Sequence, residues 1–199
     1  YLIQFVDYDG TVLKEQRVNK GESATPPTTI PEHEYLIFDE WVGQYENVAH
    51  DDVVGMLYHS IDGKDRLDID IPAGEYTRFG IYINSGTVTV DWGDGTIETY
   101  DTLSTYIELK HTYSEAFKGT IVIDCDGKFM FYKASNIYIT DYIYNVILGS
   151  HSDTIGKYGL RGFLHCNSIV IPNSLTSIGE AGINNTDIKH NTSPCMPSA

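Results

Sequence analysis

Apolar and polar residues alternate along much of the first two thirds of the chain. Every second residue is Leu, Ile or Phe in residues 67–71, 79–83 and 121–123. A period of two is typical of strands that bury one face and expose the other. Asp68 and Asp70 fall on the polar face of the first stretch, where a solvated strand surface is the simplest interpretation. No stretch of ten or more residues has a helical period, so the sequence predicts a mostly β protein.

Four Asp-Gly dipeptides divide the same region into short segments, at residues 9–10, 62–63, 94–95 and 126–127. Asp-Gly tolerates the positive φ angles of tight hairpin turns, so this dipeptide between apolar segments predicts paired strands. The clearest case joins residues 2–6 to residues 11–13.

Residues 1–62 carry several short motifs in a fixed order. They are F-x-D-Y-D-G-T-V-L from Phe5, G-x-x-A-T-P-P from Gly21, F-x-x-W from Phe38, Y-x-N-V from Tyr45 and a closing apolar strand at 53–58. This order resembles the Listeria–Bacteroides repeat, or internalin B-repeat, of bacterial surface proteins. The resemblance implies a small β-grasp-like module over residues 1–62. Glu40 stands where the family usually has Gly, so we expect the local turn before Trp41 to differ.

Residues 65–133 contain the most distinctive motif of the chain, D-W-G-D-G-T at residues 91–96, followed by His111-Thr112-Tyr113. These two motifs resemble the signature of PKD-type domains. The resemblance implies an Ig-like β-sandwich that serves as an extracellular spacer or binding module and is not usually a catalyst. The segment after Tyr113 departs from the family pattern, and one or two edge strands are expected to be missing.

Residues 134–199 have the texture of a repeat. Ile155-Gly156 recurs as Ile178-Gly179, and residues 169–179 read I-V-I-P-N-S-L-T-S-I-G. This string resembles the leucine-rich repeats of BspA-type bacterial surface proteins. The resemblance implies a short solenoid in which one strand per repeat, here at 169–171, stacks beside the next.

So short a solenoid raises a physical difficulty. A single repeat cannot bury its apolar face, and roughly three repeats are needed for a stable stack. The sequence offers one atypical repeat, one good repeat and a remnant. The stack therefore leans on the PKD-like unit, is capped by a partner, or belongs to a longer array, and we expect the last. The first residue, Tyr1, also favours a processed or excised piece of a longer protein, and homo-oligomerisation is a further possibility.

The charge of the chain narrows the classes of partner. The formal net charge is −15, with 13 Lys and Arg against 28 Asp and Glu among 199 residues. Nucleic acids and anionic membrane surfaces both need clustered basic residues, so neither is an expected partner. No apolar run reaches 18 residues, and we expect no membrane insertion. The 15 Tyr residues favour β structure.

The sequence contains little evidence for catalytic or metal-binding groups. Cys125, Cys166 and Cys195 form no C-x-x-C pair, and the seven His residues lack the close spacing of metal ligands. The sequence has neither a G-x-S-x-G elbow nor a phosphate-binding loop. Asp91 and Asp94 match a turn better than a calcium loop, although calcium remains an alternative. We therefore predict no catalytic residue, no metal ligand, no cofactor and no enzyme activity.

Exposed aromatic residues are the best binding candidates. Tyr138, Tyr142 and Tyr144 lie in an Ile- and Tyr-rich stretch. On paired strands these three rings would form a stacking platform for sugars or a docking strip for a protein. Packing between the solenoid and the sandwich would explain them equally well.

The resemblances together imply a bacterial surface mosaic. We expect a non-enzymatic extracellular protein in which the first two modules are spacers and the leucine-rich-repeat unit binds a protein or a glycan at a cell surface. One alternative is a decoration or fibre component of the virion of a phage that infects gut bacteria. Another is the accessory region of a secreted enzyme that degrades glycans or proteins.

Overall fold

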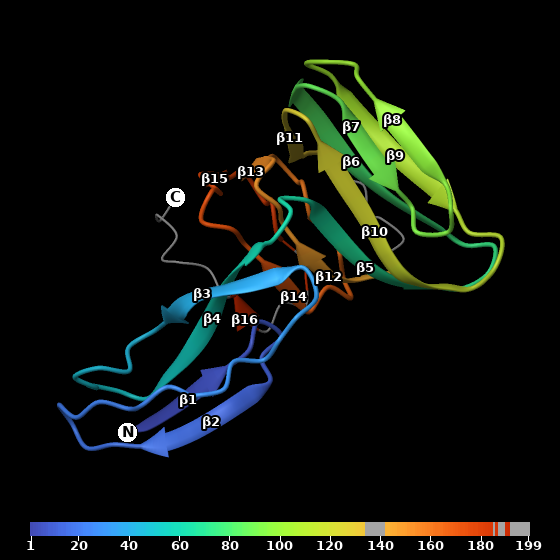
Figure 1. Ribbon diagram of the computed structural model, residues 1–199. Helices are drawn as coiled ribbons and strands as arrows, with labels where there is room; N and C mark the ends of the chain where they lie inside the picture. The colour runs from blue at the N-terminus through green and yellow to red at the C-terminus, as the bar shows by residue number, and fades with distance from the viewer. Residues whose placement is uncertain (134–141, 185, 187–189, 192–199) are drawn as a thin grey trace.

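The computed structural model describes residues 1–133, 142–184, 186 and 190–191 of the chain. Strands are the only regular elements in these ranges, and they form three sheets. The expected mostly β fold is therefore confirmed. Figure 1 shows the first sheet at one end, the green and yellow hairpins at the other end and the orange and red C-terminal strands between them.

The first sheet has four strands in the order β2-β1-β4-β3. Its strands are β1 (Leu2–Val6), β2 (Val12–Arg17), β3 (Leu36–Val42) and β4 (Asp52–Ser60). The Asp9-Gly10 turn joins β1 to β2 as an antiparallel hairpin, whereas β1 and β4 are parallel. Ile3, Phe5 and Val54 form a small core under this sheet, and the Trp41 ring stands edge-on to Phe5.

The second sheet has seven strands in the order β16-β14-β12-β5-β10-β7-β8. They are β5 (Asp65–Ile71), β7 (Val88–Asp91), β8 (Ile97–Tyr100), β10 (Phe117–Cys125), β12 (Ile143–Ile147), β14 (Ser168–Val170) and β16 (His190–Asn191). The third sheet has five strands in the order β15-β13-β11-β6-β9. They are β6 (Tyr76–Ser85), β9 (Tyr106–Thr112), β11 (Lys128–Phe131), β13 (Ser152–Ile155) and β15 (Ser177–Ile178).

The second and third sheets bury one shared core, an arrangement consistent with a β-sandwich. The period-two pattern explains it, because the apolar residues at 67–71 and 79–83 face the core while their neighbours face outward. One face of each sheet therefore excludes water and the other stays accessible to ligands.

The C-terminal strands pair in parallel rather than as hairpins. Strand β14 lies beside β12 with Ile169 opposite Val146, and β15 lies beside β13 with Ile178 opposite Ile155. Backbone hydrogen bonds continue the same offset through the connecting turns, for example from the Leu160 N–H to the Gly182 carbonyl. These contacts form a parallel stack with a repeat of 22 or 23 residues, although the described part does not show a leucine-rich-repeat solenoid.

The parallel stack continues the two sheets of the sandwich. Strand β12 pairs antiparallel with β5, and β13 pairs parallel with β11. Phe163 and Ile169 of the stack belong to the same buried core as Leu67 and Phe79. The stack thus leans on the middle part of the chain, the first of the three arrangements considered above. The sheets run across the predicted boundary between residues 133 and 134.

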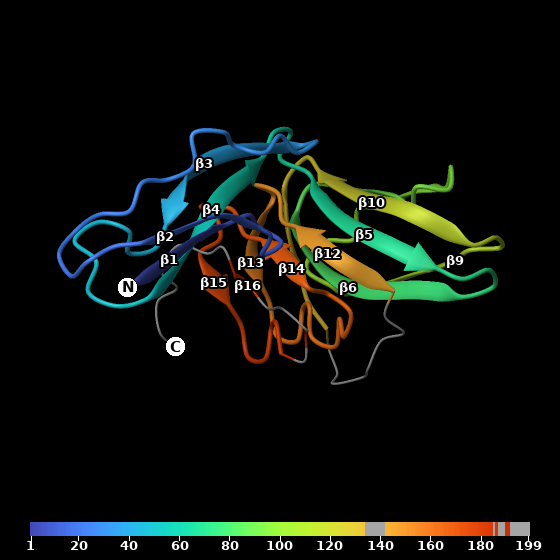
Figure 2. The same ribbon diagram turned by 90° about the horizontal axis from the view of Figure 1, so that it is seen from below.

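The first sheet also packs on the C-terminal strands. Met56 and Tyr58 of β4 share a buried cluster with Ile147 and Val170, and Figure 2 shows β4 beside β14. Arg66, at the start of β5, holds the connecting turn by two hydrogen bonds to the Asp62 carboxylate. Buried side chains therefore join the first sheet to the second, and the second to the third.

Candidate functional site

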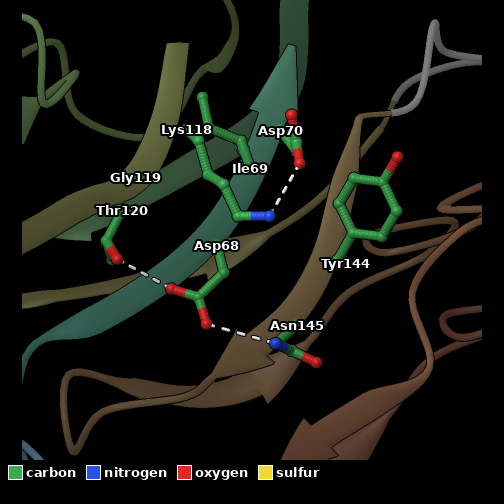
Figure 3. A pocket seen from close by; sticks show the side chains of 8 residues that line it. All are labelled: Asp68, Ile69, Asp70, Lys118, Gly119, Thr120, Tyr144 and Asn145. Carbon is green, nitrogen blue, oxygen red and sulfur yellow. Dashed lines mark hydrogen bonds and ion pairs between the residues drawn. The ribbon is translucent and has the colours of Figure 1, made fainter.

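A shallow groove lies on the outer face of the second sheet, where β10, β5 and β12 run side by side. Its volume is about 480 Å³. Figure 3 shows the side chains around it. The lining residues are Asp68, Ile69, Asp70, Lys118, Gly119, Thr120, Tyr144 and Asn145. Of the three predicted binding tyrosines, only Tyr144 is among these lining residues.

The three tyrosines have different positions. Tyr144 lines the groove, while Tyr142 is half-buried and packs against the main core. Tyr138 lies outside the described residues. The structure therefore assigns Tyr144 to an accessible surface and Tyr142 to packing, so the described rings do not lie together as a platform.

A β-bulge brings Tyr144 to the outer face. Ile143 lies opposite Ile69, but the next pair is Asn145 opposite Asp68, so Tyr144 is the extra residue on its strand. A bulge of this kind directs two neighbouring side chains to the same side of a sheet. Tyr144 and Asn145 consequently both line the groove. The backbone N–H of Asn167 donates to the Tyr144 carbonyl at 2.9 Å and holds the bulged residue.

The floor of the groove is polar because cross-strand pairs face outward there. Asp68 lies opposite Thr120, and Asp70 lies opposite Lys118, in the antiparallel pair β5–β10. Both pairs bond, at 2.7 Å between the Thr120 Oγ1 and Asp68 Oδ1 atoms and 2.9 Å between the Lys118 Nζ and Asp70 Oδ2 atoms. Directly opposed side chains are the strongest local contacts of a sheet surface.

Asp68 is the centre of a hydrogen-bond network that crosses four strands. Its Oδ1 atom accepts from Thr120, and its Oδ2 atom accepts from the Asn145 Nδ2 atom at 3.2 Å. The Ser168 hydroxyl on β14 donates in turn to Asn145 Oδ1 at 2.7 Å. Because donors from both neighbouring strands hold it, the carboxylate keeps a fixed orientation toward the groove.

Lys118 and Asp70 form a looser pair. The two side chains are 81% and 53% exposed. The hydrogen bond to Asp70, followed by its charge, raises the pKa of Lys118. Exposed pairs of this kind contribute little to stability, so either partner can turn toward a ligand at small cost.

The carboxylates of the D-W-G-D-G-T motif are used within the chain itself. Asp91 accepts from the Gly93 N–H, and Asp94 accepts from the Thr96 N–H and from His111 Nε2 at 2.7 Å. Burial alone would raise the pKa of Asp94, but the bonds from His111 and Thr96 outweigh burial and lower it. Both carboxylates therefore stabilise a turn, as the sequence predicts.

Aromatic contacts complete this corner. The Trp92 ring is fully buried and stacks on His111 at 4.9 Å, and the Tyr113 hydroxyl donates to the Trp92 carbonyl. Gly93 has a positive φ of 86°, and a Cβ atom there would lie 2.8 Å from the Phe117 ring. His111 thus has a structural role in the described corner. No group of three acidic, His or Cys ligands occurs in the described ranges to support the calcium alternative.

The described cysteines are buried. Cys125 and Cys166 are each almost inaccessible to solvent, and burial raises the pKa of Cys125, which keeps its thiol protonated. Although His165 is adjacent to Cys166 in sequence, its ring lies 5.7 Å from that of Tyr144. Cys195 lies outside the described residues.

One polar cluster was not foreseen. Asp7 accepts hydrogen bonds from the Tyr58 hydroxyl at 3.0 Å, and it lies 2.8 Å from the His33 Nε2 atom. Burial, followed by the charge of Asp7, raises the pKa of Tyr58. No local motif connects residues 7, 33 and 58, because their contacts depend on the pairing of β1 with β4. The cluster braces the first sheet, because it joins the end of β1 to β4.

Comparison with protein-family models found no match, and neither did comparisons with curated proteins or with solved structures. The described residues also contain no helix of the length and apolar character that a membrane span requires.

Proposed function

We propose that this chain is a non-enzymatic binding segment of a bacterial cell-surface protein, and that the groove beside Tyr144 is its recognition site. The observation that carries this proposal is the β-bulge in β12, which turns Tyr144 outward next to the fixed carboxylate of Asp68. A half-buried ring that faces outward beside a held polar group provides contact area and orientation together, the combination typical of a binding site.

Each resemblance has structural support. The parallel β1–β4 pair flanked by antiparallel neighbours is compatible with a β-grasp-like B-repeat. The contacts between Trp92, Asp94 and His111 stabilise the turn that contains the PKD-like motif. The 22- or 23-residue offset of the parallel strands agrees with a BspA-type leucine-rich repeat. All three modules are associated with extracellular surface proteins, and this association favours an adhesive role.

The lining of the groove favours binding over catalysis. Both oxygens of Asp68 already accept hydrogen bonds, and Asp70 is paired with Lys118. A general acid or base needs a titratable group that is free to exchange a proton with its substrate. Asp68 and the residues bonded to it instead form a fixed arrangement that recognises shape and hydroxyl or amide groups.

The site is also well supported from behind. Strand β5 at its centre pairs with β10 on one side and β12 on the other, and Ile69 lies in the main core. Binding groups carried on strands of a packed sheet keep their geometry better than groups on loops. The first sheet would then act as a spacer, and the PKD-like part together with β12 would form this rigid face.

An array of glycans and extracellular-matrix proteins tests the proposal directly. The purified chain is expected to bind at least one member, and Tyr144→Ala is expected to weaken the signal about tenfold. Tyr82→Ala is the matched control, because Tyr82 is another half-buried tyrosine, on the third sheet, and it does not line the groove. Silence of the unmodified chain across the array, or equal binding by Tyr144→Ala, would overturn the proposal.

A further inference from the structure

We infer that the groove binds one residue of a neutral saccharide, with a face of the sugar ring on Tyr144 and its hydroxyl groups on Asp68. This inference rests on the proposed function and specifies the ligand of the same site. The geometry points to it because Tyr144 and Asp68 flank one hollow from adjacent strands (Figure 3). A pyranose has both complementary features, an apolar C–H face and hydroxyl groups around its edge.

Asp68 is suited to hydroxyl donors. A carboxylate has about four acceptor positions, and Thr120 and Asn145 occupy two of them. The remaining positions are available to a ligand, and the two existing bonds hold the group so that little side-chain freedom is lost on binding. Hydrogen bonds to a charged acceptor are also about twice as strong as neutral ones.

The charges around the groove favour a neutral ligand. Asp68 and Asp70 would repel an anionic sugar, as would the formal net charge of −15. A cationic side chain would meet the Lys118 ammonium group, which already bonds to Asp70 at 2.9 Å. Lys118 in turn has further N–H donors for a hydroxyl oxygen. A ligand whose groups both donate and accept, without a net charge, fits this set best.

The size of the groove agrees with a single sugar residue. Its volume of about 480 Å³ lies at the lower end of the range for sites that bind small molecules. Because the groove lies open on the sheet face, a glycan chain can extend beyond it in either direction. The Tyr144 ring is also braced by the His165 ring at 5.7 Å, so it offers a stable stacking surface.

A chemical-shift titration of the full chain tests this inference. The probes are the methyl glycosides of glucose, galactose, mannose and N-acetylglucosamine, with glucuronic acid and tetralysine as anionic and cationic comparisons. At least one neutral glycoside is expected to shift the amide signals of Thr120, Tyr144 and Asn145 in the millimolar range. The affinity should be unchanged between low and physiological salt, because no ion pair forms.

Variants separate the ring from the carboxylate. Tyr144→Ala is expected to weaken binding about tenfold, and Asp68→Asn about tenfold or more. Tyr144→Phe keeps the ring and should bind within about twofold of the unmodified chain. Asp68→Asn also changes the network with Thr120 and Asn145, so its melting temperature is measured to show that the variant is folded. Unchanged binding by Tyr144→Phe shows that a substitution at position 144 does not by itself disturb the groove.

The outcomes distinguish this inference from the function it rests on. Shifts caused by tetralysine alone, weakening with salt, would overturn the saccharide and leave a binding groove for a basic protein segment. A Tyr144-dependent protein signal on the array, with every glycoside silent, would likewise overturn only the saccharide. Glycoside binding that Tyr144→Ala leaves unchanged would overturn the groove as the sugar site, and silence in both experiments would overturn the proposed function as well.

Discussion

The hairpin part of the sandwich (residues 65–131) and the parallel stack (residues 143–191) build the same two sheets in different ways. In the hairpin part, neighbouring strands such as β7 and β8 are antiparallel and joined by a tight turn. In the stack, neighbouring strands such as β12 and β14 are parallel and their paired residues lie 23 positions apart. One continuous sheet therefore combines hairpin pairing with parallel pairing between distant segments. The two kinds of pairing meet where β5 lies beside β12, and the register there is irregular.

The groove lies at that junction. Strand β5 of the hairpin part pairs there with β12 of the stack, and the register shift between them turns Tyr144 outward. Bulges concentrate where regular pairing must be adjusted, and they often redirect side chains for function. The proposed binding face therefore needs strands from both parts and belongs to neither alone.

Truncating a core residue of the stack is the strongest test of this union. Phe163 is fully buried in the core shared with the hairpin part. Phe163→Ala is expected to lower the free energy of unfolding by about 3–5 kcal/mol, because it removes a large apolar side chain and leaves a cavity. The hairpin part should lose the same stability, as measured by the fluorescence of buried Trp92 in a Trp41→Phe background.

The Trp41→Phe chain without the second change is the control for this experiment. Coincident transitions by Trp92 fluorescence and far-ultraviolet circular dichroism are expected in both proteins. An unchanged Trp92 transition, with an earlier loss of circular dichroism, would show that the stack unfolds by itself.

A buried carboxylate at the same junction predicts an unusual pH dependence. Asp65 of β5 is fully buried, and neither of its oxygens has a hydrogen bond of good geometry within the described part of the chain. Burial raises its pKa from 3.8 to about 7, and the nearby Ser152 side chain and Gly149 backbone N–H only partly offset this effect. The folded protein therefore holds a proton between pH 4 and 7 that the unfolded chain has lost.

The stability that depends on this proton is fully present below pH about 4 and is lost as pH rises through about 7. We expect a decrease on the order of 3 kcal/mol across this range from Asp65 alone. Asp65→Asn should remove the decrease, as measured by denaturant titrations at several pH values. A pH profile that is the same in the two proteins would show that Asp65 ionises normally.

The sequence predicted much of the hairpin part and little of the junction. Alternation at residues 67–71 depends on neighbours in sequence and appears in the structure as expected. The Asp-Gly turns at 9–10 and 94–95 join paired strands as predicted, whereas those at 62–63 and 126–127 connect strands of different sheets, because sheet pairing there is set by non-local contacts. The pairing of Asp68 with Asn145 joins residues 77 positions apart. Nothing in the local pattern indicates that contact, so Asp68 looked like an ordinary solvated strand residue.

The site residues illustrate the same limit. Tyr144 was predicted from its aromatic character, but Tyr142 had the same character and packs against the core. The difference between them lies in tertiary contacts: Tyr142 precedes β12 and packs on the core, whereas Tyr144 is the bulged residue of β12 and lines the groove. Residue type can therefore identify candidate binding residues, whereas tertiary contacts decide which of the candidate side chains is accessible.

A smaller effect is expected in the hairpin part alone. His111→Ala removes the bond to Asp94 and the ring stacked on Trp92, at an expected cost of about 1–2 kcal/mol in the free energy of unfolding. It should also return the pKa of Asp94 toward its usual range. Because its pKa is lowered, ionised Asp94 stabilises the folded state at pH values above the ordinary carboxyl pKa, and this stabilisation is lost as pH falls. The His111→Ala variant should therefore lose less stability on acidification than the unmodified chain.

Carboxyl titration by carbon-13 chemical shifts measures the Asp94 pKa in both proteins. Lys118→Ala serves as the control, since it removes the partner of an exposed carboxylate and should leave the free energy of unfolding nearly unchanged. Equal costs for His111→Ala and Lys118→Ala would contradict a structural role for the buried corner.

The smallest expected change in stability is at the groove itself. Tyr144 is half-buried on the outer face, and its backbone, not its ring, maintains the bulge through the bond from Asn167 to its carbonyl. Tyr144→Ala should therefore change the free energy of unfolding by less than about 0.5 kcal/mol, although it is expected to weaken binding about tenfold. Thermal melting of Tyr144→Ala beside Tyr144→Phe, which keeps the ring, measures what the ring contributes to stability. A loss of about 2 kcal/mol or more in Tyr144→Ala alone would mean that the Tyr144 ring holds the junction together, and the groove would then be a by-product of packing.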